Sequence, residues 1–279
     1  MSQSLGTLYV VATPIGNLAD MVPRAVQVLQ SVALIACEDT RHSGRLLQHF
    51  AITGRCVAYH DHSDDKRTEQ ILAHLRAGEE VALISDAGTP LVSDPGYRLV
   101  RAARQSGIPV VPIPGACAFV AALSAAGLPS NRFTFEGFLP AKAGARLAAL
   151  EALADDPRTL IFYEAPHRVL ACVQDMVRAF GPERELVMAR ELTKTFETIH
   201  SATAAQMSEW IAADSNQQRG EIVLLAHGAP ERKTGLTAEA ERVMTLLLAE
   251  LPVKKAAALG AKLTGSKKNE LYQWALAQR

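Results

Sequence analysis

The chain has 279 residues and a hydrophobic content of 48%, which favours two domains over one, since single cores rarely grow beyond roughly 250–300 residues. Its 29 basic and 29 acidic residues cancel, which excludes the overall basic field of many nucleic-acid-binding proteins. No run approaches the roughly 18 apolar residues of a membrane helix, and the start of the sequence lacks the features of a signal peptide. We therefore predict a cytoplasmic protein without a membrane partner.

The four cysteines indicate neither a metal site nor a disulfide framework. Cys37, Cys56, Cys117 and Cys172 are widely separated and form no CxxC pair, the spacing that zinc and redox sites favour. Two of them lie within apolar runs, where a free cysteine behaves as a small hydrophobic residue. We therefore predict buried thiols and no bound metal.

The first part of the chain predicts a doubly wound α/β domain over residues 1–128. Short β-branched runs alternate with helical patterns, as expected for parallel strands joined by helices. The expected strands cover 7–13, 33–37, 56–60, 80–85 and 108–113, and a helix follows over 115–127. Asp20 is placed to cap the first helix, and Pro23 suits its first turn.

Residues 129–230 predict a second domain of mixed α/β type. The expected strands cover 132–138, 158–164, 185–191, 196–202 and 220–228, with helices near 143–154, 166–180 and 203–213. Because only a short segment separates the third and fourth of these strands, we expect them to pair as an antiparallel hairpin.

Three helical patterns follow a linker at 228–236 and predict a helical extension over residues 231–279. They cover 237–250, 253–263 and 267–278, and a turn with Gly265 and Ser266 joins the last two in the manner of a helix-turn-helix. From Pro252 to Arg279 there are six basic residues against one acidic residue. Two interpretations stay open here: a helical cap that packs on the body, or a contact with RNA.

Four of the predicted parallel strands end in unusual loops. These are "ATPIGNLAD", "EDTRHSGR", "SDAGTPLVSDPG" and "PIPGACA". Ligands of open α/β sheets bind outside the carboxyl ends of the strands. Neither GxxxxGK[ST] nor GxGxxG is present, so the loops predict a cleft for a ligand held by glycine backbone, rigid proline turns and short polar side chains rather than by a phosphate cradle. For any single loop, ordinary turn chemistry is the favoured explanation of the residues.

The loops and several later motifs together resemble one family. "ATPIGNLAD", "EDTR", "LISDAGTPLVSDPG", "PIPGACAFVAALSAAGL", "GFLP", "FYEAPHR", "RELTK" and "GEIVLL" occur in the order and approximate spacing of the ribosomal RNA small-subunit methyltransferase I family, over residues 7–228. That family belongs to the tetrapyrrole-methylase-like, or class III, S-adenosylmethionine-dependent methyltransferases. The resemblance implies two α/β domains with the cofactor in the cleft between them, a helical extension, a homodimer, and 2′-O-methylation of a cytidine ribose in the decoding region of 16S rRNA.

The resemblance assigns the cofactor, S-adenosylmethionine, to two of the loops. The residues expected to bind it are Asp86, Gly88, Thr89, Pro90, Ser93, Asp94, Pro114, Gly115 and Ala116. Two alternatives remain: Ala116 can serve close packing of helix on sheet, and Asp94 can do no more than start the next helix. "SDAGTP" stands where the wider superfamily has Gly-Asp-Pro, so contacts transfer to it only approximately.

Candidate catalytic residues are Asp39, Glu38, Glu164 and His167, because a weakly nucleophilic ribose hydroxyl gains from a positioned base. Candidate RNA contacts are Arg41, Lys142, Arg146, Arg168, Arg190 and Lys194, since such side chains bind phosphates. The alternative for "EDTR" is a cap and salt bridge that open the helix over 41–50, and the alternative for His167 is a place in the first turn of a helix.

Two other functions remain open at this stage. One is a class III methyltransferase that acts on a tetrapyrrole or another small molecule. The other is a noncatalytic RNA-binding or ribosome-assembly module. The four loops argue against the module, because a pure binding protein has little need of so many turns and carboxylates at one edge of a sheet.

Overall fold

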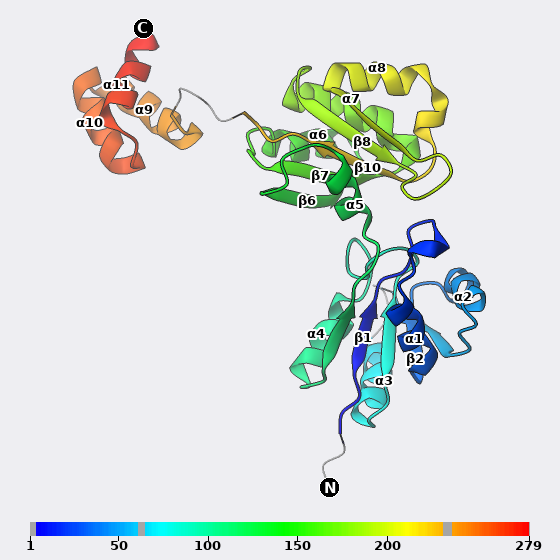
Figure 1. Cartoon of the computed structure of the whole chain (residues 1–279). Helices are drawn as coiled ribbons and strands as arrows, with labels where there is room; N and C mark the ends of the chain where they lie inside the picture. The colour runs from blue at the N-terminus through cyan, green and yellow to red at the C-terminus, as the bar shows by residue number, and fades with distance from the viewer. Residues whose placement is uncertain (1–3, 61–64, 231–235, 279) are drawn as a thin grey trace. The chain divides into compact units, whose positions relative to one another are not determined.

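The computed structural model describes residues 4–60, 65–230 and 236–278, and the chain divides into two compact units, residues 1–229 and 230–279 (Figure 1). The larger unit contains two five-stranded sheets, and the smaller contains three helices. None of the described helices combines the length and the apolar character needed to cross a membrane. The further division at residues 128/129 stays a prediction.

The first sheet is entirely parallel, which confirms the five strands predicted in the first part of the chain. Its strands are β1 (Leu8–Val11), β2 (Leu34–Cys37), β3 (Arg55–Ala58), β4 (Val81–Ile84) and β5 (Val110–Ile113), in the order β3-β2-β4-β1-β5. Its helices are α1 (Pro23–Ser31), α2 (Thr40–His49), α3 (Asp65–Arg76) and α4 (Tyr97–Gln105).

Side chains alternate between the two faces of this sheet, as the two-residue period of a strand requires. Leu34 packs with α3 and α4, and its neighbour Ile35 packs with α1 and α2. β1 and β4 are adjacent strands, yet the helices that follow them lie on opposite faces. The loops after β1 and β4 therefore diverge from one point at the carboxyl edge, the place where open α/β sheets bind ligands.

The second sheet is mixed, with the order β6-β7-β10-β8-β9. Its strands are β6 (Phe133–Phe138), β7 (Thr159–Glu164), β8 (Glu185–Arg190), β9 (Thr198–Thr203) and β10 (Ile222–Ala226). β6 and β7 pair in parallel, the other neighbours are antiparallel, and the predicted β8–β9 hairpin is confirmed.

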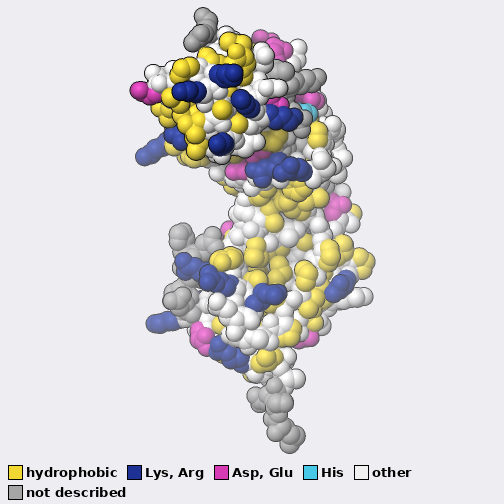
Figure 2. Space-filling model, turned by 90° about the vertical axis from the view of Figure 1, so that its left-hand side faces the viewer, with side chains coloured by type: hydrophobic (Ala, Val, Ile, Leu, Met, Phe, Trp, Pro, Cys, Tyr) yellow, Lys and Arg dark blue, Asp and Glu magenta, His cyan; other side chains and the backbone are white. Residues whose placement is uncertain are grey.

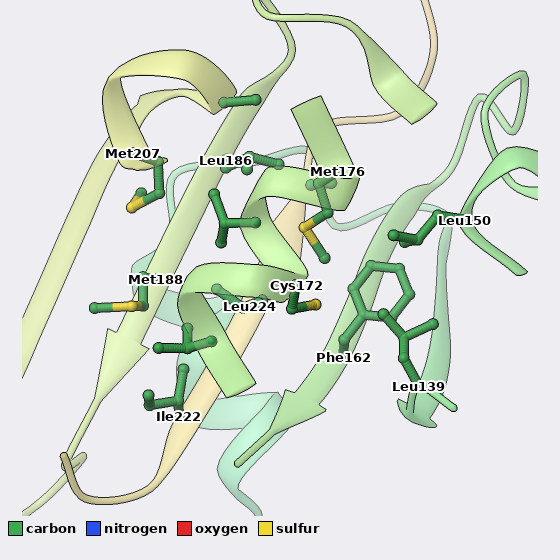
Figure 3. Close-up of a cluster of buried hydrophobic side chains, with 14 of the residues drawn as sticks. Leu139, Leu150, Phe162, Cys172, Met176, Leu186, Met188, Met207, Ile222 and Leu224 are labelled. Carbon is green, nitrogen blue, oxygen red and sulfur yellow. The ribbon is translucent and has the colours of Figure 1, made fainter. Parts of the chain in front are cut away.

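Both faces of the mixed sheet are covered. Helices α6 (Ala143–Ala152), α7 (Val169–Phe180) and α8 (Ala204–Ala213) bury one face around Phe162, Met176 and Met188 (Figure 3). Helix α5 (Ala118–Ala125) covers the other face, where Ile15 from the loop after β1 joins the same hydrophobic cluster. This shared cluster fixes the first loop of the parallel sheet against the mixed sheet.

The smaller unit has its own core. Helices α9 (Ala238–Glu250), α10 (Val253–Thr264) and α11 (Lys268–Ala277) pack around Met244, Ala257 and Leu271. Gly265 ends α10 in the left-handed conformation, with φ of 73°, and opens the short turn to α11. The three predicted helices are confirmed, while residues 231–235 of the predicted linker lie outside the described residues.

Two predicted helix starts need comment. Asp20 does not cap α1: it ends a short 3-10 helix (Leu18–Asp20), and α1 begins after Val22 with Pro23 in its first turn, as predicted. The prediction failed because the intervening "MV" extends the chain before the helix starts. The Asp39 carboxylate does cap α2, accepting a hydrogen bond of 2.8 Å from the backbone N–H of Arg41.

Candidate active site at the strand ends

The loop after β4 connects the other loops of the parallel sheet. The backbones of Gly88 and Thr13 exchange two hydrogen bonds of 2.8 and 3.0 Å. An Asp86 carboxylate oxygen accepts one of 3.2 Å from the backbone of Asp39, and the Thr89 hydroxyl donates one of 2.9 Å to the Ala116 carbonyl. The loops after β1, β2, β4 and β5 are thereby held in one arrangement before any ligand binds.

Backbone strain gathers at two loops of the site. Leu91 and Ser93 after β4, and Glu191 and Thr193 after β8, have φ of 73°, 61°, 52° and 68°. Such conformations cost of order 1–3 kcal/mol for residues other than glycine and persist only where the surroundings enforce them. Strain of this kind is common at ligand-binding loops, and both loops lie beside a cavity.

The first cavity has a volume of about 370 Å³, which is in the range of small-molecule sites. The lining residues come from both sheets: Ile15, Ala87, Gly88, Thr89, Val92, Ser93, Asp94, Cys117, Ala118, Phe138, Tyr163, Glu164, Ala165, Pro166, Ala189, Leu192, Gly220, Glu221, Ile222 and Val223. The lining is mainly apolar. Its charged members are three carboxylates, and it includes no lysine or arginine, so it suits a partly apolar ligand that carries positive charge.

A second cavity of about 320 Å³ adjoins the first. Its lining comes from the loops after β1, β4 and β8 and from α2: Pro14, Ile15, Gly16, Leu18, His42, Ser43, Arg45, Leu46, Ser85, Asp86, Ala87, Lys194 and Glu221. Ile15, Ala87 and Glu221 belong to both linings. The two cavities therefore share a wall, and the second differs from the first in being lined by basic side chains.

The predicted cofactor residues divide into three groups. Gly88, Thr89, Ser93 and Asp94 line the first cavity, whereas Asp86 lines the second. Asp94 does not cap α4, because Gly96 holds that position. The remaining residues, Pro90, Pro114, Gly115 and Ala116, line neither cavity.

Gly115 and Ala116 have a packing role. A Cβ on Gly115 would lie 2.9 Å from the Cβ of Ala12, so glycine allows the loop after β5 to approach β1 closely. Ala116 contacts the hydrophobic cluster under α5 and offers its carbonyl to Thr89. The packing alternative thus accounts for both residues, and Ala116 orders the cofactor loop indirectly through Thr89.

The predicted catalytic carboxylates lie in different surroundings. Asp39 caps α2 and lines neither cavity. The backbone N–H of Arg41 holds the pKa of Asp39 below its usual value, which makes it a weaker base. Glu38, the preceding residue, also lies outside both linings.

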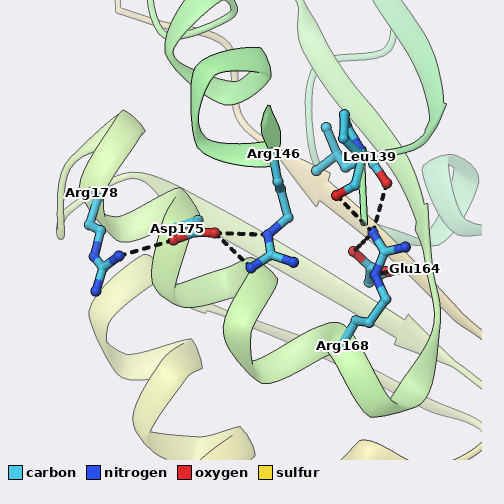
Figure 4. A network of polar contacts seen from close by, with 7 residues as sticks. Leu139, Arg146, Glu164, Arg168, Asp175 and Arg178 are labelled. Atoms are coloured by element: carbon cyan, nitrogen blue, oxygen red, sulfur yellow. Dashed lines mark hydrogen bonds and ion pairs between the residues drawn. The ribbon is translucent and has the colours of Figure 1, made fainter. Parts of the chain in front are cut away.

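Glu164 lines the first cavity but is fully buried and already paired. Its carboxylate lies 3.0 Å from the Arg168 guanidinium, which also donates a hydrogen bond of 2.7 Å to the Leu139 carbonyl (Figure 4). His167 is exposed in the short 3-10 helix Pro166–Arg168 and lines neither cavity. The position of His167 in this short helix agrees with the alternative interpretation, a place in the first turn of a helix.

Two predicted RNA contacts need correction. Arg146 is 5% exposed; its Nε donates a hydrogen bond of 2.8 Å to Asp175, and its Nη2 forms an ion pair of 2.8 Å with the same carboxylate oxygen (Figure 4). Arg190 is 7% exposed and donates to the Phe196 carbonyl and the Thr198 hydroxyl. Buried guanidinium groups with internal partners do not reach a phosphate. Arg168 is similarly engaged, so all three arginines stabilise the mixed sheet.

Lys194 lines the second cavity, where two ion pairs hold its side chain. Its ammonium lies 2.8 Å from Glu191 and 3.0 Å from Glu221, and its stem crosses Gly16, where an added Cβ would lie only 2.5 Å away. Burial opposes its charge, but the two carboxylates outweigh that effect and raise the pKa of Lys194. Lys194 therefore joins the loop after β8 to the loop after β1. Arg41 and Lys142 are exposed, as an RNA contact requires.

Several residues of the site escaped sequence analysis. Cys117 and Tyr163 line the first cavity, Arg45 lines the second, and Glu221 lines both. Tyr163 and Cys117 lie inside the "FYEAPHR" and "PIPGACA" motifs, so the signal for them was present. Arg45 and Glu221 lie inside "EDTRHSGR" and "GEIVLL" as well, but only the tertiary fold shows that α2 and the start of β10 meet at the same edge.

Comparison with known proteins decides the family. The model for tetrapyrrole (corrin/porphyrin) methylases matches residues 7–208, and that for the RsmI C-terminal HTH domain matches residues 234–279. A ribosomal RNA small subunit methyltransferase I of Pseudomonas aeruginosa is 61% identical over 99% of both chains. The chain belongs to the ribosomal RNA small subunit methyltransferase I family. A member from Escherichia coli O157:H7 is 56% identical over 99% of this chain and 96% of its own.

Solved structures show the same fold in more distant proteins. A uroporphyrin-III-C-methyltransferase from Thermus thermophilus has a TM-score of 0.57 at 21% identity, over 80% of this chain and 94% of its own. The cobalt precorrin-4 methyltransferase CbiF has a TM-score of 0.57 at 15% identity, over 79% and 94%. The predicted fold class, with two α/β sheets of the tetrapyrrole methylase type and C-terminal helices, is confirmed.

Proposed function

We propose that the protein transfers a methyl group from S-adenosylmethionine to the 2′-hydroxyl of a cytidine in the decoding region of 16S rRNA. The observation that carries this proposal is the pair of adjoining cavities, of which one is mainly apolar with three carboxylates and the other carries His42, Arg45 and Lys194 beside Asp86 and Glu221. The names of the relatives, which are 50–61% identical, support rRNA of the small subunit as the acceptor. Such a protein works in the cytoplasm.

The first cavity fits the cofactor. Its apolar lining suits the adenosine, while Asp94 suits the positive charges of the methionine end. Tyr163 stays a neutral phenol because burial raises its pKa, and its oxygen accepts a hydrogen bond of 3.2 Å from the backbone of Phe119. A Thermus thermophilus fold neighbour was crystallised with S-adenyl homocysteine.

The cofactor supplies an electrophilic methyl group on a sulfonium. The residues that would hold the cofactor, Gly88, Thr89, Ser93 and Asp94, would direct this methyl group to the acceptor oxygen, and the hydroxyl proton would pass to water. The residues of this chain contribute orientation and exclusion of water, because the loop after β4 is already bonded to its neighbours. No described carboxylate is both free and placed in the shared wall, since Glu221 is paired with Lys194, so we expect positioning to contribute more than a base.

Helices α10 and α11 carry lysines that are available for an RNA contact, whereas Arg146, Arg168 and Arg190 around the mixed sheet are held by internal partners. Among the described residues, Lys254, Lys255, Lys262 and Lys268 form no ion pair, and Lys267 lies 3.5 Å from Glu270. Figure 2 shows basic and hydrophobic side chains together on the face of this unit turned to the viewer. We propose that these lysines bind rRNA phosphates, within an assembled small subunit.

This RNA contact has a measurable salt signature. Each lysine that neutralises a phosphate contributes a slope of about 1 to the dependence of log affinity on log salt concentration. Lys255→Ala with Lys268→Ala should lower the slope by up to about 2. Arg242→Ala is the matched control, because Arg242 is already paired with Glu239 on α9. An equal slope in all three proteins would contradict the contact.

A homodimer is a further part of the proposal. Both edge strands of the mixed sheet carry exposed hydrophobic side chains, with Phe133 on β6 and Ile199 on β9. Monomeric proteins rarely expose hydrophobic side chains along the edge of a sheet, so such edges indicate a partner that covers them. Sedimentation equilibrium measures the mass directly, and a monomer at micromolar concentration would contradict this part alone.

The experiment that tests the function is transfer of a tritiated methyl group. We expect incorporation into 30S particles and none into a uroporphyrinogen acceptor, with the modified nucleotide mapped as a 2′-O-methylcytidine. Labelling of the tetrapyrrole and not of rRNA would favour a small-molecule methyltransferase. Absence of S-adenosylmethionine binding in calorimetry would favour a noncatalytic RNA-binding module.

A further inference from the structure

If the first cavity holds the methyl donor, the second cavity is available for another ligand. It lies on the other side of Ile15, Ala87 and Glu221, and its mouth is formed by the first two turns of α2. Backbone hydrogen bonds between Thr13 and Gly88 fix the loops after β1 and β4, which contribute Ile15 and Ala87 to the shared wall. A ligand in the second cavity would therefore meet the first cavity at a fixed separation.

The charges of the second cavity differ from those of the first. His42, Arg45 and Lys194 line it together with Asp86 and Glu221. Lys194 is neutralised by its two carboxylates. Arg45 is exposed and forms no ion pair with any described residue, so it is the cation at this mouth that is free to bind an anion.

A buried hydroxyl in the same lining also lacks an ordinary hydrogen-bond partner. Ser43 is 2% exposed, and its oxygen forms no hydrogen bond of ordinary geometry with a described residue, although it lies close enough to the Cys37 thiol to lower the pKa of that thiol. A buried polar group without a partner costs roughly 1–3 kcal/mol, and in native proteins such groups often await a ligand or water. Ser43 and Arg45 therefore make one wall of the cavity polar, with a buried hydroxyl and an exposed guanidinium.

We propose that the second cavity receives the ribonucleotide that is methylated, with Arg45 bound to its phosphate and the ribose beside Ser43. This inference rests on the proposed function, which supplies the RNA substrate and the donor in the first cavity. A planar guanidinium binds phosphate oxygens through two parallel hydrogen bonds. The volume of about 320 Å³ admits one nucleotide, so the target is a single-stranded or unstacked nucleotide, as in most sequence-specific RNA recognition.

Arg45→Ala tests this assignment, with Arg104→Ala as the matched control. Arg104 lies in the last turn of α4, is exposed, and lines neither cavity. We expect Arg45→Ala to raise the KM for the RNA acceptor about tenfold, with the Kd for S-adenosylmethionine changed less than twofold. Arg104→Ala should leave both values unchanged.

Binding of cytidine 3′,5′-bisphosphate, measured by calorimetry in the absence of donor, gives a readout that does not depend on turnover. The wild type should bind it, and Arg45→Ala should weaken the binding about tenfold. Equal binding of inorganic phosphate would show that only the anion is recognised, which would overturn the nucleotide assignment. A raised Kd for S-adenosylmethionine in Arg45→Ala would instead assign the cavity to the cofactor, and unchanged values throughout would overturn the proposal.

These outcomes are separable from a failure of the proposed function. If the wild type transfers no methyl group to RNA, the function fails whatever Arg45 does. If the wild type is active and Arg45→Ala is indistinguishable from it, the function stands and the second cavity loses its assignment. Ser43→Ala gives a second variant, and we expect a smaller rise in KM because it removes one neutral hydrogen-bond donor.

Discussion

The strand ends of the two sheets use their polar residues in different ways. At the parallel sheet, backbone and short side chains of one loop bind the neighbouring loops, as Gly88 and Thr89 do, and two cavities remain beside them. Around the mixed sheet, long charged side chains bind internal partners: Arg146 pairs with Asp175, and Arg168 pairs with Glu164 and donates to a backbone carbonyl. The comparison teaches that the number of charges in a segment is a poor guide to where a ligand binds.

The largest expected effect lies in the mixed sheet. Arg146→Ala leaves Asp175 buried at 4% exposure with only the exposed Arg178 as a partner, and removal of one member of a buried pair costs about 3–5 kcal/mol. Urea denaturation measures the loss. Arg178→Ala is the control. Arg178 lies 3.3 Å from the same carboxylate and its side chain is 69% exposed, so this ion pair contributes at most about 1 kcal/mol.

The same pair of variants distinguishes a structural arginine from one that binds RNA. If Arg146→Ala kept the free energy of unfolding of the wild type and lost affinity for RNA, Arg146 would belong to the RNA surface. The contrast between the two sheets would then be wrong.

A smaller effect is expected at the loop after β4. Gly88 has φ of 81°, and a Cβ there would lie 3.2 Å from Ile15, so Gly88→Ala costs roughly 1–2 kcal/mol of backbone strain. If the strain is relieved by a shift of the loop, the affinity for S-adenosylmethionine falls roughly tenfold. Calorimetry measures the affinity.

Gly107→Ala is the matched control for this variant. Gly107 has φ of 70° with open space around its Cα, so its backbone strain is the same while it lines neither cavity. It should lower stability without changing cofactor affinity. Equal affinities of the two variants would show that the loop after β4 does not bind the cofactor.

A further effect concerns pH and applies to both halves of the larger unit. Burial, followed by the neighbouring Cys56, raises the pKa of Cys37 to about 12, and burial beside Glu164 raises the pKa of Cys172. An unfolded thiol has a pKa near 8.5. Above that pH the unfolded state loses protons that the folded state keeps, so stability falls as pH rises.

By linkage, the loss at pH 10 is on the order of 1–2 kcal/mol for each thiol. Urea midpoints at pH 7 and pH 10 should differ less in Cys37→Ala with Cys172→Ala than in the wild type. An identical difference in both proteins would show that the two thiols ionise as easily in the folded as in the unfolded protein.

Much of the fold followed from the sequence because its patterns are local. The ten strands were predicted to within a few residues, since β-branched runs bounded by glycine and proline mark them. The predicted cap of the first helix was wrong because Asp20 is a good cap in isolation, while Asn17 already caps the 3-10 helix that Asp20 ends. Local capping preferences do not show which of two neighbouring polar residues is used.

The candidate site was only partly predictable. Gly88 and Thr89 lie in a dense loop motif and line the first cavity, as expected of cofactor residues. Arg146 and Arg190 were misassigned because their partners, Asp175 on α7 and the Phe196 carbonyl in the loop before β9, come from other elements. Arg45 was missed because a lone arginine on a helix gains meaning only from what the fold places opposite it.

The central claim is that the first cavity holds S-adenosylmethionine, and alkylation of Cys117 tests it most directly. Cys117 lines that cavity and is half-buried, as is Cys56 outside it, while Cys37 and Cys172 are buried. With iodoacetamide at pH 8, a cofactor concentration that saturates binding in calorimetry should slow alkylation of Cys117 at least tenfold and leave that of Cys56 unchanged. Equal rates at Cys117 with and without bound cofactor would contradict the claim.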